Sequence, residues 1–166
     1  MAIAYIAVGS NVGDRDAHIQ KAVALLRENE NIQVLAVSGL LETEPEGMAF
    51  TDKRGIPGKF LNGVLKIKTD LMPVDLLAAL KNVERRCGRT KAEHNAPRTM
   101  DLDILFYDDV VIVEGKTLSI PHPKMHERLF VLKPLSEIAP DFVHPRLQKT
   151  ARELLDSLAE PTPPSR

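Results

Sequence analysis

Residues 60–88, FLNGVLKIKTDLMPVDLLAALKNVERRCG, decide the fold because the spacing of their apolar residues changes from every second residue to helical spacing. From Phe60 to Thr69, apolar and polar residues alternate, as in a strand. Pro73 suits the first turn of a helix and Gly88 its C-terminal cap. Between them the apolar residues fall on one side: Leu76, Leu77, Leu80 and Val83. The stretch therefore predicts a strand followed by an amphipathic helix.

The chain before this stretch repeats the same two patterns. Ala2 to Val8 is apolar and predicts a buried strand that ends in the turn Gly9, Ser10, Asn11. Asp14 to Glu28 has apolar residues at helical spacing, and Ile32 to Leu41 is rich in β-branched residues, as strands are. Glu44 to Lys59 contains two prolines and three glycines and predicts a long loop.

The chain after it predicts further strands and two helices. Thr99 to Tyr107 is expected to be a strand, Asp108 and Asp109 a turn, and Val110 to Val113 its hairpin partner. The remaining elements are a short extended piece and two helices: Leu118 to Ile120, Leu129 to Ile138 and Thr150 to Leu158.

The order of these elements predicts the fold class. Strand, helix, strand, strand, helix, strand indicates an α+β sandwich with a mostly antiparallel sheet, a ferredoxin-like β-α-β-β-α-β core and helices packed on one face. We expect a single domain over residues 1–160 and a disordered tail over 161–166.

Composition narrows the functional classes. The 166 residues carry a net charge of −1, which gives no overall attraction for nucleic acid or an anionic membrane. Cys87 is the single cysteine, so an internal disulfide and a zinc site built on several thiolates are excluded, and a reducing cytoplasm is expected. The chain also lacks the run of roughly 20 apolar residues that a membrane span needs.

An alternating acidic pair is the first candidate site. On a strand, Asp101 and Asp103 project to one face with Thr99, their Cα atoms roughly 6.6 Å apart, while a second set projects to the other: Met100, Leu102, Ile104 and Phe106. Two carboxylates this close repel unless a cation or proton lies between them, and Mg²⁺ commonly uses only one or two protein carboxylates. Taken alone, such a pair more often belongs to a solvated sheet face than to a metal site.

Basic residues gather just before this pair. The tract contains Arg85, Arg86, Arg89, Lys91, His94 and Arg98. Carboxylates for a cation beside guanidinium groups for phosphate oxygens would suit a metal-bound polyphosphate. A surface patch neutralised by Glu84 and Glu93 is the alternative. Farther on, Pro121 and Pro123 flank His122 and fix the backbone around its imidazole, which suits a structural turn as well as a site.

These pieces together resemble the 6-hydroxymethyl-7,8-dihydropterin pyrophosphokinases of folate biosynthesis. The resemblance rests on six segments in the family's order: Tyr5 to Asn11, Thr43 to Gly47, Phe60 to Asn62, Glu84 to Arg89, Pro97 to Leu105 and Pro121 to Phe130. It implies transfer of pyrophosphate from ATP to the pterin hydroxymethyl group, with release of AMP, by a cytoplasmic enzyme that is more often monomeric than dimeric.

The resemblance also implies roles for individual residues. Asp101 and Asp103 would bind two Mg²⁺ ions, and Arg89, Arg98 and His122 would be catalytic. The nucleotide would meet Glu84, Arg89, Lys91, Arg98, Ile104, His122 and Arg128. The pterin would meet Thr43, Pro45, Phe60, Asn62 and Phe130. Without the resemblance, Phe60 and Phe130 would be expected in the core.

The sequence departs from the family pattern in several places, two of which change the length or composition of a whole segment. Residues 94–98 read His-Asn-Ala-Pro-Arg where the family often has Arg-Trp-Gly-Pro-Arg, and the stretch from Gly88 is one residue shorter. The loop from Glu44 to Lys59 is longer than in the family. Both changes fall beside the expected substrate sites, so we expect them to affect closure around substrates.

Two other classes remain open on sequence alone. A metal-dependent phosphodiesterase or nuclease would use the same aspartates to activate water. A nucleic-acid module without catalytic activity would use a similar α+β sheet, although an aromatic content of 4% and the near-zero net charge argue against it.

Overall fold

Strand β1 (Ala2–Ser10) lies in the middle of the main sheet. It pairs antiparallel with β4 (Phe60–Thr69) on one side and with β5 (Asp101–Tyr107) on the other. Strands β2 (Ile32–Val37) and β3 (Leu41–Thr43) follow one another along the far edge of β4. This computed structural model describes residues 1–10, 15–43, 60–87, 100–115 and 117–159.

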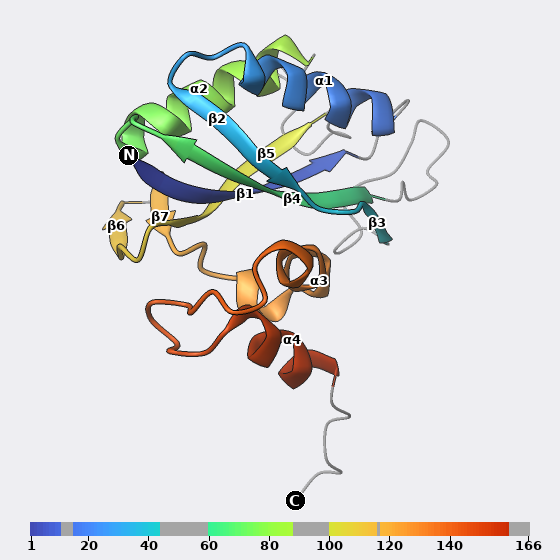
Figure 1. Ribbon diagram of the computed structural model, residues 1–166, viewed down its shortest axis with the longest axis vertical. Coiled ribbons are helices and arrows are strands. Elements are labelled where there is room, and N and C mark those ends of the chain that lie inside the picture. Colours follow the sequence, from blue (N-terminus) through green and yellow to red (C-terminus); the bar gives the residue numbers. More distant parts are fainter. Residues whose placement is uncertain (11–14, 44–59, 88–99, 116, 160–166) are drawn as a thin grey trace, which may run out of the picture.

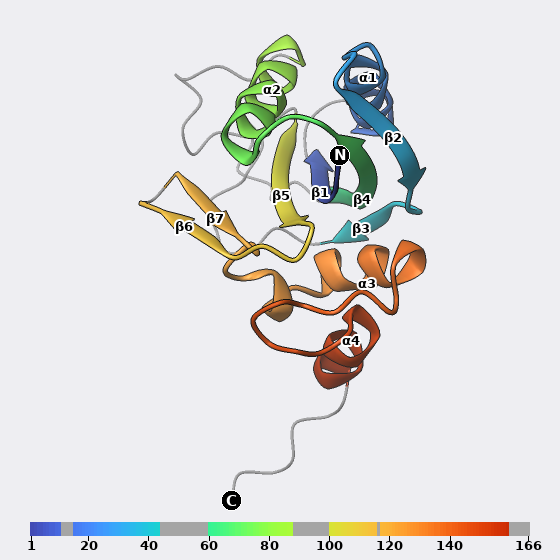
Figure 2. The same cartoon turned by 60° about the vertical axis from the view of Figure 1, so that its left-hand side comes forward.

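Helices cover both faces of this sheet (Figures 1 and 2). Helices α1 (Arg15–Arg27) and α2 (Pro73–Arg86) lie on one face. The short helix η2 (Met125–Glu127), α3 (Leu129–Ile138) and α4 (Ala151–Ala159) lie on the other. The prediction of helices on one face is therefore wrong, whereas the α+β class and the ferredoxin-like order β2-β4-β1-β5 are confirmed.

The second helical layer forms because β1 is apolar on both faces. Ala4, Ile6 and Val8 belong to the core cluster beneath α1 and α2. Tyr5 belongs to the other cluster, and Ala7 packs against it. A strand buried on both faces needs an apolar layer on each side, because buried apolar surface must be shielded from water.

The predicted strand over Ile32 to Leu41 is interrupted at Ser38. The Ser38 N–H donates to the Val64 carbonyl over 2.9 Å, and the Val64 N–H donates to the Ser38 hydroxyl over 2.8 Å. A Cβ on Gly63 would lie 2.8 Å from the Leu40 side chain, so the chain crosses close over β4 here. The side-chain hydroxyl replaces a backbone acceptor, and the strand divides into β2 and β3.

The predicted hairpin between Thr99 to Tyr107 and Val110 to Val113 is also wrong. Asp108, in the turn, has φ +48° and is tied to β1, because its N–H donates to the Ile3 carbonyl and its Oδ1 accepts from the Ile3 N–H. The chain then leaves the sheet, and β6 (Ile112–Glu114) pairs with β7 (Leu118–Ile120) in a separate two-stranded sheet.

Several predictions fall outside the described residues. These are the loop from Glu44 to Lys59, the cap at Gly88, the basic tract from Arg89 onward and the tail over 161–166. Within the described parts of the chain, no helix has the length and apolar character to cross a bilayer.

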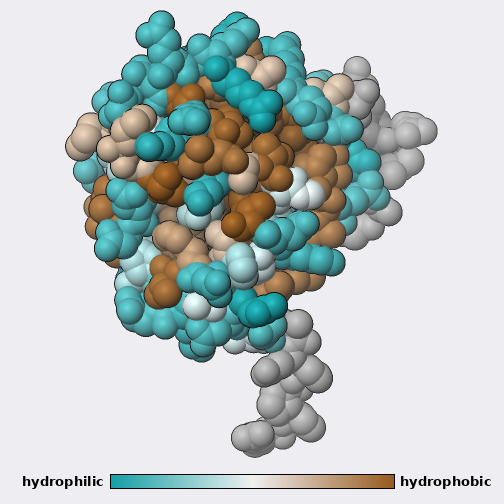
Figure 3. Space-filling model, viewed as in Figure 1, coloured by the Kyte–Doolittle hydropathy of each residue, from teal (hydrophilic) through white to brown (hydrophobic). Residues whose placement is uncertain are grey.

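Apolar surface gathers across the middle of the molecule on the side where β2 faces the viewer (Figure 3). Leu35 and Val37 of β2 are 42% and 40% exposed. Leu35 has no partner in the pairing of β2 with β4, because Val34 and Ala36 pair with two consecutive residues of β4. Such a bulge on an outer strand hinders edge-to-edge pairing with another sheet.

We predict that Ser38→Ala lowers the free energy of unfolding by about 1–3 kcal/mol, because the buried Val64 N–H loses its acceptor. Urea denaturation measures the change. Ser136→Ala is the matched control, since the buried Ser136 hydroxyl has no hydrogen-bond partner among the described residues. Equal stability of the Ser38→Ala variant and the wild type would contradict this account of the strand break.

Candidate functional site

A row of residues crosses the sheet near the C-terminal end of β1. In the strand register, Asp101 of β5 lies opposite Gly9 of β1, and Gly9 lies opposite Asn62 of β4. Two positions along, Asp103 lies opposite Ala7. Directly opposed residues share a face, and Ala7 packs on the α3 side, so this row faces α3. The fold thus brings three distant segments together on one face.

Gly9 makes room for this row. A Cβ at this position would lie 3.0 Å from the Asn62 Oδ1 and 3.8 Å from the Phe60 ring. Gly9 and Ser10 were expected in a turn, but both belong to β1. Gly9 is a site residue that sequence reasoning missed, since a glycine at the end of a strand indicates a turn as readily as a close approach.

The two aspartates lie beside small residues. Asp101 is partly buried and Asp103 is exposed. Their partners on β1 are Gly9 and Ala7, which leave the carboxylates accessible on this face. Two carboxylates on one strand face suit a hard divalent cation, which takes its remaining ligands from water and substrate. Within the described ranges, no group of three or more His, Cys, Asp or Glu side chains forms a fuller protein cage for a metal.

The alternation along β5 breaks after these aspartates. Ile104 pairs with Ile6 and Phe106 with Tyr5, so Leu105 is passed over in the register. Phe106 therefore packs with Tyr5 in the α3-side cluster. The prediction that Phe106 projects away from the aspartates is wrong, because a β-bulge rotates the strand by one position.

Glu84 of α2 reaches the outer edge of β5. Its side chain is 5% exposed, and its Oε2 accepts a hydrogen bond from the Leu102 N–H over 2.8 Å. Leu102 separates the two aspartates in sequence and pairs with Val8 on its inner side. The structure thus places Glu84 against the backbone of the acidic strand.

His122 lies along the same edge. The backbone N–H of His122 donates a hydrogen bond to the carbonyl of Leu105, the bulged residue, over 3.1 Å. Its Nδ1 accepts from the Lys124 N–H over 3.3 Å, which fixes the imidazole against the following turn. The short helix η2 then leads to Arg128, whose guanidinium carbon lies 5.6 Å from the centre of the Phe130 ring. Such a cation–π contact orients both side chains.

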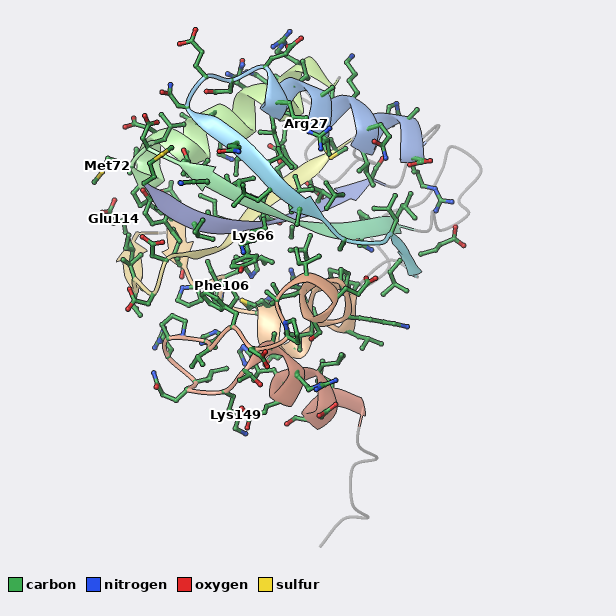
Figure 4. All side chains as sticks on the ribbon, in the orientation of Figure 1. Arg27, Lys66, Met72, Phe106, Glu114 and Lys149 are labelled. Carbon is green, nitrogen blue, oxygen red and sulfur yellow. The ribbon has the colours of Figure 1, made fainter. Side chains whose placement is uncertain are left out.

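An aromatic cluster supports this region from the same face. Phe106 lies between the sheet and the α3 and α4 layer (Figure 4), where its ring centre is 6.1 Å from Tyr5 and 4.5 Å from Phe142. His144 packs edge-on against Phe106 at 5.5 Å, with its Nδ1 accepting from the Arg146 and Leu147 N–H groups. Burial lowers the pKa of His144, and His126 and Arg146 act in the same direction.

Not every predicted residue joins this site. The register and contacts bring Asp101, Asp103, Asn62 and Phe60 to one face. The Ile104 side chain lies in the opposite core beneath α1 and α2, so only its backbone is available from the strand edge. Thr43 pairs with Phe60 in the strand register. Outside the described residues lie Pro45, Arg89, Lys91 and Arg98.

Fold and site together define a class: α+β proteins with a ferredoxin-like core and an acidic pair on the sheet face that α3 covers. Residues 5–140 match the family model of 7,8-dihydro-6-hydroxymethylpterin-pyrophosphokinase. The chain belongs to this family.

Relatives of known sequence agree with this assignment. The 2-amino-4-hydroxy-6-hydroxymethyldihydropteridine pyrophosphokinase of Bacillus subtilis is 46% identical over 136 residues, which are 82% of this chain and 77% of the relative. The Aquifex aeolicus protein of the same name is 41% identical over 153 residues, 92% of this chain and 90% of the relative. The Schizosaccharomyces pombe folic acid synthesis protein fol1 is 46% identical over 156 residues, 94% of this chain but 20% of its own length.

Solved structures support the fold. Plasmodium falciparum HPPK-DHPS superposes with a TM-score of 0.74 over 94% of this chain and 44% of that chain, at 18% sequence identity. At this identity the similarity concerns the fold alone.

We predict that acid destabilises the protein through His144. The folded state favours the neutral imidazole, so its pKa is lowered from 6.5, and the unfolded chain binds more protons just below that pH. This contribution to stability is fully present above pH 6.5 and is lost as pH falls through the lowered pKa of the folded state.

His144→Asn tests this, because the Asn Oδ1 can replace Nδ1 as acceptor without titrating. Urea denaturation from pH 7.5 to 5 should give a flatter decline for the variant than for the wild type. Identical pH dependence in both proteins would show that His144 is not the group responsible.

Proposed function

We propose that this chain transfers pyrophosphate from ATP to 6-hydroxymethyl-7,8-dihydropterin. The hydroxymethyl oxygen forms a bond to the β-phosphorus of ATP, the bond from that phosphorus to the oxygen bridging to the α-phosphate breaks, and AMP leaves. The observation that carries the proposal is the family match over residues 5–140. The names of the two bacterial relatives, which this chain covers over most of their length, support it.

Asp101 and Asp103 would hold Mg²⁺. Their shared face, the exposure of Asp103 and the small residues opposite them fit an ion that keeps places for water and phosphate oxygens. Bound Mg²⁺ neutralises the charge that develops on transferring phosphates. The protein's own contribution is to fix the two carboxylates on a paired strand, so that little rearrangement is needed when the metal nucleotide arrives.

Basic residues would hold the triphosphate beside this pair. His122 is anchored to the strand edge through the Leu105 carbonyl, and Arg128 precedes the first turn of α3. By the family resemblance, Arg89, Lys91 and Arg98 would add further contacts. Guanidinium groups suit this task because they donate paired hydrogen bonds to phosphate oxygens.

The pterin would lie on the same sheet face. Asn62 is 7% exposed and offers an amide that matches the hydrogen-bonding edge of a pterin. Phe60 and Phe130 would stack on the two faces of its ring, since flat heteroaromatic rings gain from stacking. Thr43, opposite Phe60 in the register, and Pro45 would complete this part of the site.

We predict that the protein, MgATP and 6-hydroxymethyl-7,8-dihydropterin together yield AMP and the pterin diphosphate. Chromatography that resolves AMP from ADP measures the reaction. A control without pterin separates transfer from hydrolysis, because a phosphodiesterase would consume nucleotide without the acceptor. ADP as the product, or turnover that does not depend on pterin, would overturn the proposal.

We further predict that Asp101→Asn or Asp103→Asn lowers kcat at least about 10²-fold, the usual scale for loss of one electrostatic stabiliser of a transition state. Steady-state assays at saturating MgATP measure the effect. Asp109→Asn is the matched control, since Asp109 is exposed in the turn beyond β5. Full activity of both site variants would remove the aspartates from the metal site.

A further inference from the structure

Glu84 occupies a position that costs the helix stability. It lies close to the C-terminal end of α2, where the helix dipole disfavours a carboxylate and favours the neighbouring Arg85 and Arg86. It is also buried, and a buried carboxylate needs hydrogen bonds to offset the loss of its hydration. Neither helix formation nor core packing favours an acidic residue at this position. The contact between the Glu84 side chain and β5 therefore needs an explanation of its own.

That contact falls at the centre of the acidic pair. Strand β5 is last in the order β2-β4-β1-β5, so its outer edge faces away from β1. The Leu102 N–H on this edge donates to Glu84 over 2.8 Å. A hydrogen bond to a charged acceptor is stronger than one between neutral groups, and burial strengthens it further. It fixes the backbone at the one residue that both aspartates flank.

We infer that Glu84 is a positioning residue for the metal site, acting through the Leu102 backbone. The inference rests on the proposed function, because it takes Asp101 and Asp103 as the metal ligands. Without Glu84, the outer edge of β5 would lose its acceptor, and the strand would fray where the two carboxylates must hold a fixed separation. The expected consequence is weaker metal binding.

Binding of Mn²⁺ tests this without turnover. Electron paramagnetic resonance measures how much Mn²⁺ the protein binds in the absence of nucleotide, so that loss of a nucleotide contact to Glu84 does not affect the result. Glu84→Ala should raise the Mn²⁺ concentration for half-saturation about 10-fold, the lower end of the effect of removing groups that orient metal ligands. Glu84→Gln keeps an acceptor for the Leu102 N–H and should lose clearly less affinity for Mn²⁺ than Glu84→Ala does.

Ser38→Ala is the matched control. It also removes a 2.8 Å hydrogen bond that a strand N–H donates to a side-chain oxygen, but this N–H belongs to β4, which β1 separates from the strand of the aspartates. It should lower stability and leave Mn²⁺ binding unchanged. Unchanged Mn²⁺ binding in Glu84→Ala, or a loss in Glu84→Gln as large as in Glu84→Ala, would overturn the inference.

Amide exchange of Leu102, followed by NMR in the nucleotide-free protein, keeps the inference testable if Glu84→Ala does not fold. The Leu102 N–H should be protected in the wild type and in Glu84→Gln. Exchange as fast as that of a solvent-exposed amide would overturn the inference. Absence of AMP formation by a wild type that binds Mn²⁺ normally would instead overturn the proposed transfer reaction, so the two failures are distinct.

Discussion

The burial of β1 on both faces is the constraint on which the rest of the structure depends. One face is covered by α1 and α2 and the other by α3 and α4. On the α3 side the face divides in two. Tyr5, Phe106 and Phe142 fill one end, and Asp101, Gly9 and Asn62 occupy the other. The candidate site therefore lies at one end of the sheet face on which α3 packs, and the aromatic cluster fills the other end.

The outer edge of β5 is the second determinant. An edge strand presents unpaired backbone groups, which proteins usually cover. Here Glu84 accepts from Leu102, and His122 donates to Leu105. Both contacts come from segments that the family resemblance assigns to nucleotide binding. The residues that cover this edge are therefore ones that the resemblance assigns to the nucleotide, and they occupy the edge that a strand after Asp109 would need in order to pair with β5.

Periodicity was sufficient to predict most of the elements. The strand over Phe60 to Thr69 and the helix over Leu129 to Ile138 have the bounds that the structure shows, because each is set by a local pattern. The alternation in β5 likewise placed both aspartates on one face. These features depend on neighbours within a few residues, which is the range that a hydrophobic pattern reports.

Long-range contacts were not predictable in the same way. The partner of β6 depends on what already occupies the edge of β5, and the break at Ser38 depends on a hydroxyl meeting β4. The roles of Gly9 and Glu84 depend on Asn62 and Leu102, residues far away in the sequence. The sequence alone shows a glycine and a glutamate at these positions, but it does not show which residues they contact in the fold.

The bulge at Leu105 allows β5 to carry both the two aspartates and Phe106 on the α3 side of the sheet. With strict alternation from Asp101, Phe106 would point toward α1 and α2, and Tyr107 would point toward α3. The extra residue reverses this, so Phe106 completes the aromatic cluster and the Tyr107 hydroxyl donates to the Leu71 carbonyl over 2.6 Å on the other side. The carbonyl of Leu105 accepts from His122. One inserted residue therefore lets β5 bury an aromatic ring on the face that also carries the two aspartates, and its carbonyl anchors His122 at the strand edge.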